Sequence, residues 1–140
     1  MNKLSAELIR AEVTRFWKVF CEKDALSLAE FYGHESSVFG SASPRSEPGR
    51  LAATRRQREY FGAHSTIKAT FGHIEVQLLG DGTAAVADYT FTFQASKVMT
   101  AIGGTTEEKI QHGRATQVFA YDPDGKLHII HEHLSTVDKS

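Results

Sequence analysis

The chain has 140 residues, of which 41% are hydrophobic and 24% are charged, and its 16 Lys and Arg nearly balance its 17 Asp and Glu. This length fits one domain over residues 1–140, and the composition is that of an ordinary soluble globular protein. A net charge of -1 argues against nucleic acid or an acidic membrane surface as a partner, and no apolar run is long enough to span a bilayer.

The first part of the chain predicts helices. Apolar residues recur at helical spacing over 5–23, which indicates an amphipathic helix. Asp24 is placed to cap a second, shorter helix over 25–32. A short strand at 37–39 and a largely basic third helix over 50–61 are expected to follow.

The second part of the chain has the alternation of apolar and polar residues that is typical of strands. Two runs of alternating apolar residues meet at Gly72-His73, where the alternation shifts by one residue. This shift predicts a β-bulge. The segments expected beyond it are a turn at 80–82, strands over 84–95 and 106–121 with a loop over 96–106 between them, a turn at 122–125 and a last strand over 126–137. Helices followed by a long meander predict an α+β fold, with three N-terminal helices packed on a strongly bent, mostly antiparallel sheet.

The last hairpin distributes polar side chains over two faces. If the residues flanking the turn pair with each other, Arg114, His131 and His133 share one face, with Arg114 opposite His133. Gln117 and Glu132 then share the other face. Apolar residues occur on both faces, so we expect helices to cover one and a second copy of the chain to cover the other, as a homodimer.

Two chemical interpretations of the first face remain open. Arg114, His131 and His133 can hold a carboxylate or polarise a carbonyl, because Arg supplies fixed donors and His titrates near neutral pH. They can equally form a structural network that links two strands. A metal site on the two histidines would need further ligands that the spacing does not supply, so neither a metal nor another cofactor is expected.

Two carboxylates and three aromatic residues complete the candidate site. Asp88 and Glu132 lie in strands that read as buried or half-buried, where a carboxylate can act as a general base. The alternative is a surface position or a salt bridge. Trp17, Tyr32 and Phe20 either line a pocket or belong to the core. The single cysteine, Cys21, favours a reducing, cytoplasmic compartment.

Three segments carry a resemblance to a known family, namely GRATQVF (113–119), DG (124–125) and IIHEHLS (129–135). They are similar to the C-terminal signature of the nuclear transport factor 2-like superfamily. More narrowly, they resemble stand-alone bacterial proteins of the polyketide-cyclase-like (SnoaL-type) group and the association domain of calcium/calmodulin-dependent protein kinase II. The resemblance covers nearly the whole chain and implies a cone-shaped, cystatin-like fold with a pocket at its wide end.

The resemblance implies two functions. The first is a binding or assembly domain for a small, partly apolar molecule, working as a homodimer or a larger oligomer, with Arg114, His131, His133, Gln117 and Trp17 as candidate ligand contacts. The second is a cofactor-independent isomerase, cyclase or hydratase of the ketosteroid-isomerase-like type. Its base would be Asp88 or Glu132, chosen from the residue pattern and not from the resemblance, because the tyrosine and aspartate of the steroid isomerases have no matched positions in this chain. The kinase association domain has pocket arginines at the positions of Gln117 and Leu134, so an acidic ligand is less expected here.

Overall fold

The computed structural model describes residues 3–40, 45–56, 61, 66–99 and 105–137 of the chain. Its helices are α1 (Ala6–Cys21), α2 (Ala25–Ala29) and α3 (Gly49–Arg56). Its strands are β1 (Tyr32–Phe39), β2 (Glu47–Pro48), β3 (Thr66–Phe71), β4 (Glu75–Leu79), β5 (Ala84–Met99), β6 (Thr105–Tyr121) and β7 (Leu127–Val137).

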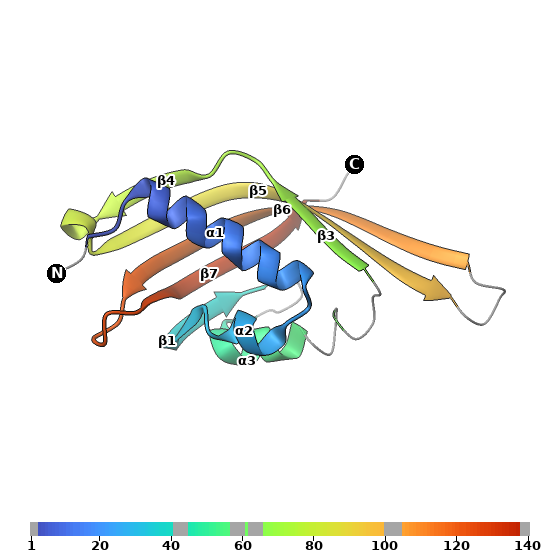
Figure 1. The fold of residues 1–140 in the computed structure, drawn as a ribbon, viewed down its shortest axis with the longest axis horizontal. Helices are drawn as coiled ribbons and strands as arrows, with labels where there is room; N and C mark the ends of the chain where they lie inside the picture. The colour runs from blue at the N-terminus through green and yellow to red at the C-terminus, as the bar shows by residue number, and fades with distance from the viewer. Residues whose placement is uncertain (1–2, 41–44, 57–60, 62–65, 100–104, 138–140) are drawn as a thin grey trace.

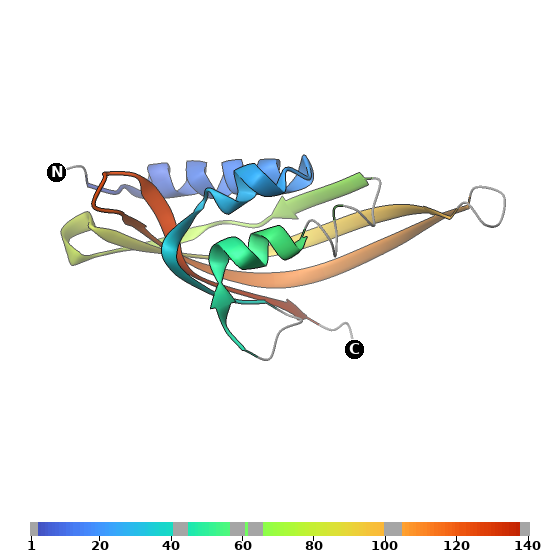
Figure 2. The same ribbon diagram turned by 90° about the horizontal axis from the view of Figure 1, so that it is seen from below.

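The helices lie on the concave side of one curled, unclosed sheet (Figures 1 and 2). The strand order is β2-β1-β7-β6-β5-β3, and β4 also pairs with β5. The β1–β7 pair is parallel, and the other pairs among the described residues are antiparallel. The predicted α+β class, with helices on one face of a bent and mostly antiparallel sheet, is therefore confirmed.

Helix α1 forms where its apolar spacing predicts. The hydroxyl of Ser5 accepts the backbone N–H of Leu8 at 3.1 Å, which satisfies one of the free donors at the helix start. One face of the helix is buried against the sheet and consists of Ile9, Val13, Phe16, Trp17 and Phe20. This face supplies the aromatic part of the core.

Helix α2 is shorter than predicted, and Tyr32 begins a strand instead of ending the helix. The backbone oxygen of Phe31 accepts the N–H of Ile129 in β7 at 2.7 Å. This bond starts the parallel pairing of β1 with β7, in which Tyr32 lies beside Ile129. Tertiary pairing therefore overrides the apolar pattern that extended the helix in the prediction.

Helix α3 agrees with the prediction over its described part. It begins at Gly49, and residues 57–60 of the predicted helix lie outside the described residues. Arg55 forms an ion pair with Glu47 of β2, with 2.6 Å between nitrogen and oxygen. Part of the predicted basic face is thus paired within the protein rather than presented to solvent.

The predicted bulge between β3 and β4 is confirmed. Phe71 pairs with Phe91 of β5, whereas Glu75 pairs with Asp88. Residues 72–74 therefore stand opposite only two residues of β5, so one extra residue is inserted. The apolar phase slip in the sequence marks this position.

The hairpin of β5 and β6 extends further than predicted. Ser96 still pairs with Glu108, and the ladder continues to Met99 and Thr105, so the predicted loop over 96–106 is too long. This end of the hairpin projects from the body of the molecule (Figure 1). Strands that project from the body of the protein have no core to pack against, so they need no apolar face. The alternation of apolar residues in the sequence therefore ends before the strands end. Residues 100–104 lie outside the described residues.

The predicted register of the last hairpin is wrong. Arg114 pairs with Ser135, and His133 pairs with Thr116. Near the turn, Tyr121 pairs with Leu127 rather than with the residue before it. The turn is therefore one residue longer than expected.

A second bulge accounts for the remainder of the shift. Val118 pairs with His131, but Phe119 pairs with Ile129, which leaves Ile130 without an opposite residue. Phe119 and Ile129 both point into the core, where each is 1% exposed, whereas Ile130 is 39% exposed. Ile129 therefore lies on the same face as Gln117 and Glu132, not on the face of Arg114.

Among the described residues no helix is both long and apolar enough to cross a membrane.

Candidate functional site

Two neighbouring strands place a buried amide beside a buried carboxylate. Gln117 of β6 pairs directly with Glu132 of β7, and both side chains point toward the helices. Both residues are 0% exposed. The Gln117 amide nitrogen donates to Oε2 of Glu132 at 2.7 Å. A carboxylate buried this deeply needs such donors, because a buried charge without them is strongly destabilising.

A tyrosine from β1 supplies the next donor. The hydroxyl of Tyr32 lies 2.9 Å from Oε1 and 3.0 Å from Oε2 of Glu132. These residues are 100 positions apart in the sequence, and the parallel β1–β7 pairing brings them together.

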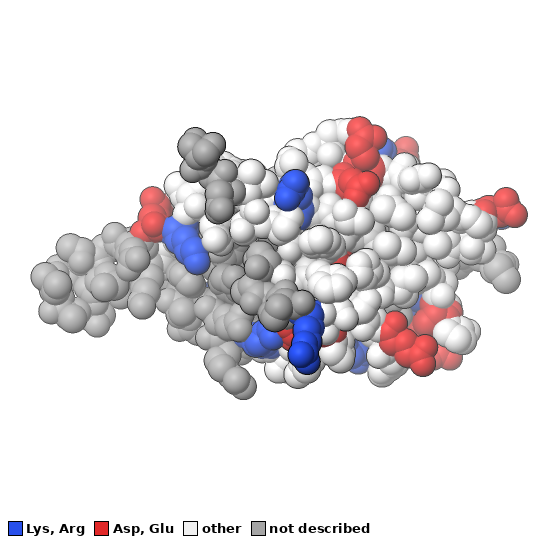
Figure 3. Space-filling model, turned by 180° about the vertical axis from the view of Figure 1, so that it is seen from behind, with Lys and Arg blue, Asp and Glu red and all other residues white. Residues whose placement is uncertain are grey.

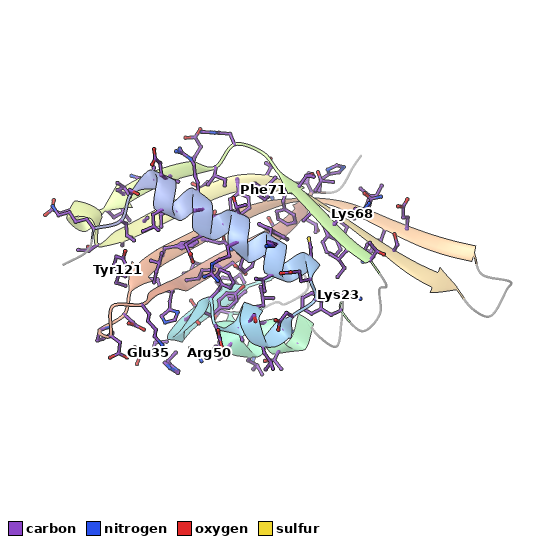
Figure 4. All side chains as sticks on the ribbon, in the orientation of Figure 1. Lys23, Glu35, Arg50, Lys68, Phe71 and Tyr121 are labelled. Carbon is purple, nitrogen blue, oxygen red and sulfur yellow. The ribbon has the colours of Figure 1, made fainter. Side chains whose placement is uncertain are left out.

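Helix α3 closes over the ring of Tyr32. A Cβ at Gly49 would lie 2.5 Å from Cδ1 of Tyr32, so only glycine permits this approach. The Arg50 side chain (labelled in Figure 4) donates to the backbone oxygen of Tyr32 at 3.0 Å. The start of α3 and β1 are thus held together at the site.

A second chain of hydrogen bonds reaches Gln117 from helix α1. The indole nitrogen of Trp17 donates to the Tyr89 hydroxyl at 2.8 Å, and that hydroxyl donates to Oε1 of Gln117 at 2.8 Å. Trp17 and Tyr89 are 3% and 5% exposed. We call the connected group the inner polar set; its members are Trp17, Tyr32, Tyr89, Gln117 and Glu132.

Aromatic rings surround the inner polar set. Phe16 lies 6.2 Å from the ring of Tyr32, and Phe91 lies 4.9 Å from the ring of Trp17, measured between centroids. Side chains from α1 and from the sheet point into the space between them (Figure 4). The arrangement combines one carboxylate and a phenol in hydrogen-bond contact with apolar surroundings. Chemically, such a group can hold the polar part of an apolar molecule or move a proton.

The other predicted site residues lie on the opposite, outer face of the sheet. Arg114 and His133 are exposed, and His131 is half-buried. Nδ1 of His131 is 2.8 Å from the Ser37 hydroxyl, and the Phe39 ring contacts both histidine rings. This outer face carries few charged side chains (Figure 3).

Asp88 also lies on the outer face. It is exposed and accepts a hydrogen bond from the Thr116 hydroxyl at 2.7 Å. The structure thus separates the sequence candidates into two groups. It brings Trp17, Gln117 and Glu132 together inside, and it leaves Arg114, His131, His133 and Asp88 outside.

No group of three or more His, Cys, Asp or Glu within the described residues is arranged to hold a metal ion.

Of the two tyrosines of the inner polar set, the sequence offers Tyr32 only as an aromatic residue of either a pocket or the core, and it does not select Tyr89. Tyr32 was assigned to a helix, so its alignment with Glu132 was not visible. Tyr89 lies on the apolar face of β5, between the buried residues Ala87 and Phe91. A hydroxyl on an otherwise apolar strand face is a signal for a buried hydrogen-bond partner, and it could have identified Tyr89.

Three solved structures illustrate the similarity of the fold. A protein from Streptomyces avermitilis, assigned as a dehydratase of the nuclear transport factor 2-like family, has a TM-score of 0.78 and 18% identity over 95% of this chain and 97% of that one. An assigned scytalone dehydratase from Novosphingobium aromaticivorans has a TM-score of 0.76 and 13% identity over 93% and 82%. An assigned calcium/calmodulin-dependent protein kinase II association domain from Xanthomonas campestris has a TM-score of 0.73 and 18% identity over 100% and 97%.

These identities support a shared fold and no more. A comparison with curated proteins finds no match. The model of the SnoaL-like domain matches residues 9–139. Because that match spans nearly the whole chain, and its fold neighbours are nuclear transport factor 2-like proteins, the chain belongs to the SnoaL-like domain family.

Proposed function

We propose that this protein is a small-molecule-binding domain, similar to a stand-alone association domain, and that its ligand contacts the inner polar set. The observation that carries the proposal is Glu132, a wholly buried carboxylate in hydrogen-bond contact with Tyr32 and Gln117. The aromatic surroundings favour a compact, partly apolar ligand. The polar set favours one that carries a hydroxyl or carbonyl group.

Energetics supports a recognition role for these groups. A buried ionic or polar cluster is often no more stabilising than well-packed apolar side chains of the same volume, because desolvation offsets the attraction. Gln117 and Glu132 sit at the centre of a core that is otherwise rich in aromatic rings. Their presence there is easier to explain by ligand recognition than by stability of the fold.

A second candidate function is acid–base catalysis without a cofactor, and the Tyr32–Glu132 contact favours it. In a dehydration, Glu132 would take the proton next to a carbonyl, and the β-hydroxyl would leave as water with the proton of Tyr32. Glu132 would then return its proton to Tyr32 across their hydrogen bond of 2.9 Å. Two of the similar structures are assigned as dehydratases, which agrees with this alternative.

The proposed partner of the protein is a second copy of itself. Phe39 and Ile130 are each 39% exposed on the outer face, and Val118 lies half-buried beside them. Covering this face with an identical face would form an isologous dimer and remove these apolar side chains from water. We place the protein in the cytoplasm, because its composition includes a single cysteine.

A thermal-shift comparison tests the binding proposal. The probes are naphthol, tetralone and indanone, which combine a fused apolar ring with one hydroxyl or carbonyl group. We expect at least one of them to raise the unfolding temperature of the wild type and of Arg114→Ala, but not that of Glu132→Gln. The proposal is wrong if Glu132→Gln responds like the wild type, or if Arg114→Ala alone removes the response.

The catalytic alternative has its own measurement. A cyclic β-hydroxyketone is incubated with the protein, and enone formation is followed by absorbance. If Glu132 is the base, Glu132→Gln abolishes turnover but leaves binding of the substrate nearly intact. If the wild type binds the β-hydroxyketone but does not convert it, the catalytic alternative is wrong for this reaction, and the binding function stands.

A further inference from the structure

We propose that Tyr89 is a positioning residue of this site, which holds the Gln117 amide so that its N–H end faces Glu132. Trp17 anchors Tyr89 in turn. The inference rests on the proposed function in so far as ligand recognition depends on Glu132. The orientation of the amide can be tested without any ligand.

The two ends of the hydrogen-bond chain fix its direction. An indole N–H can only donate, so the Tyr89 oxygen accepts from Trp17 at 2.8 Å, and its own proton is available for Gln117. A carboxylate can only accept, so Glu132 requires the N–H end of the Gln117 amide at 2.7 Å. The amide oxygen is then left to accept from Tyr89 at 2.8 Å.

The opposite orientation of the amide is unfavourable at both ends. A flipped Gln117 would place its oxygen against Oε2 of Glu132, where two acceptors repel each other. It would also place N–H groups against the Tyr89 hydroxyl, whose proton would then lose its acceptor, the Gln117 oxygen. The Tyr89 hydroxyl therefore does more than fill space, because it selects one of two orientations of nearly equal shape.

The position of Trp17 makes this selection rigid. Its ring packs against Phe20 and Phe91, with centroids 5.1 and 4.9 Å away. These contacts restrict rotation of the indole and so hold the direction of its N–H. Each bond in the chain is buried, where water does not compete for donors or acceptors.

Loss of the Tyr89 hydroxyl is expected to release the amide. In Tyr89→Phe the Gln117 oxygen loses its donor, and the amide can rotate away from Glu132. The carboxylate would then lack one of its donors and meet a ligand in an unfixed geometry. We expect the affinity for the probe that binds best among naphthol, tetralone and indanone to fall about 10- to 100-fold, the effect of losing one hydrogen bond to a charged group.

A double-mutant cycle tests whether Tyr89 acts through Gln117. Probe affinity is measured for Tyr89→Phe, Gln117→Met and the double variant, with Tyr121→Phe as the control for removing a tyrosine hydroxyl at a half-buried position. If Tyr89 acts through Gln117, the double variant binds no more weakly than Gln117→Met alone. Independent, additive losses would overturn the proposal, because they would indicate a general structural role.

Nuclear magnetic resonance of the side-chain amides gives a readout that needs no ligand. In the wild type the Gln117 amide protons should be well separated and protected from exchange with water, and in Tyr89→Phe this protection should be lost. Unchanged protection would overturn the proposal. If no probe binds the wild type, the proposed function fails, and this measurement still decides the role of Tyr89. If Tyr89→Phe does not fold, Trp17→Phe replaces it, because it removes the first donor and keeps an aromatic ring.

Discussion

Glu132 and Tyr32 form the contact on which the proposed function of the interior depends. The hydroxyl of Tyr32 reaches both oxygens of the carboxylate, at 2.9 and 3.0 Å. Because both residues are 0% exposed, water does not replace this donor when it is removed. A change at Tyr32 should therefore affect stability more than the loss of a surface hydroxyl would.

The first prediction concerns Tyr32→Phe. Removing the hydroxyl leaves the buried carboxylate short of one donor, and this should lower the free energy of unfolding by about 1–3 kcal/mol. Urea unfolding measures the change, and Tyr121→Phe provides a half-buried tyrosine as the control. Equal stability of Tyr32→Phe and the control would contradict the contact described here.

The second prediction concerns Asp122 at the turn between β6 and β7. Its Oδ1 accepts the backbone N–H groups of Lys126 and Asp124, both at 2.9 Å, and its Oδ2 lies 2.9 Å from Nε2 of His128. The backbone bond from Lys126 is the largest cause that lowers the pKa of Asp122 from its ordinary value of 3.8. The resulting stability is present above that ordinary value and is lost as the pH falls through the lowered pKa of the folded state.

We therefore expect Asp122→Asn to unfold at a lower temperature than the wild type at neutral pH. The difference should disappear in acid, once the wild-type carboxyl is protonated as well. Thermal unfolding across an acidic pH series measures this, with Asp124→Asn as a control in the same turn. If the difference in unfolding temperature stays constant to the most acidic pH of the series, the charge of Asp122 does not cause it.

At this scale the sequence identified part of the site. Alternation along two strands placed Gln117 with Glu132, and it placed Arg114 with the two histidines on another face. It could not connect Glu132 to Tyr32, which is 100 positions away, because that contact depends on a parallel pairing that no local pattern indicates.

At the scale of the elements, a glycine in β6 sets how closely the sheet packs on α1. Gly113 pairs with Phe91 of β5, and the Phe91 ring occupies the space that a Cβ of residue 113 would take. That ring in turn contacts Trp17, with centroids 4.9 Å apart. A glycine in the middle of a strand is thus required by close approach of a ring.

The third prediction is that Gly113→Ala destabilises the protein by about 1–3 kcal/mol through overpacking of the core. The emission of Trp17, the single tryptophan of the chain, should change because Phe91 is pushed toward it. Gly40→Ala is the matched control, because nothing lies within 4 Å of a Cβ built there. Unchanged stability and emission in Gly113→Ala would contradict this account of the packing.

The two bulges show why one irregularity was predictable and the other was not. Before Gly72 and after it the apolar residues alternate in different phases, so the slip is visible in the sequence. At the second bulge Ile129 is followed by Ile130, and either isoleucine satisfies an apolar position. The two adjacent isoleucines conceal the shift, and the register predicted across the hairpin was wrong for this reason.

At the scale of the molecule, the two faces of the sheet differ in what covers them. The concave face packs on the helices (Figure 2). The members of the inner polar set are all buried on this side. The outer face presents apolar side chains together with Arg114, His131 and His133. We interpret the outer residues as part of the proposed dimer surface rather than of the ligand site.

The fourth prediction tests that surface. Sedimentation at micromolar concentration should give a dimer for the wild type, and Ile130→Asp should shift it to a monomer because a charge is then buried between the copies. Leu26→Asp, at an α2 residue that is 84% exposed, is the control and should remain dimeric. A monomeric wild type would refute the dimer, without bearing on the interior site.

The central claim is that the interior, and not the outer face, binds the ligand. The most direct test is a crystal structure of the protein with whichever of naphthol, tetralone or indanone raises its unfolding temperature most. We predict that the polar group of the probe lies within hydrogen-bond distance of Glu132 or Tyr32, between the helices and the sheet. A probe bound on the outer face beside Arg114 and His133, with the inner polar set unchanged, would contradict the claim.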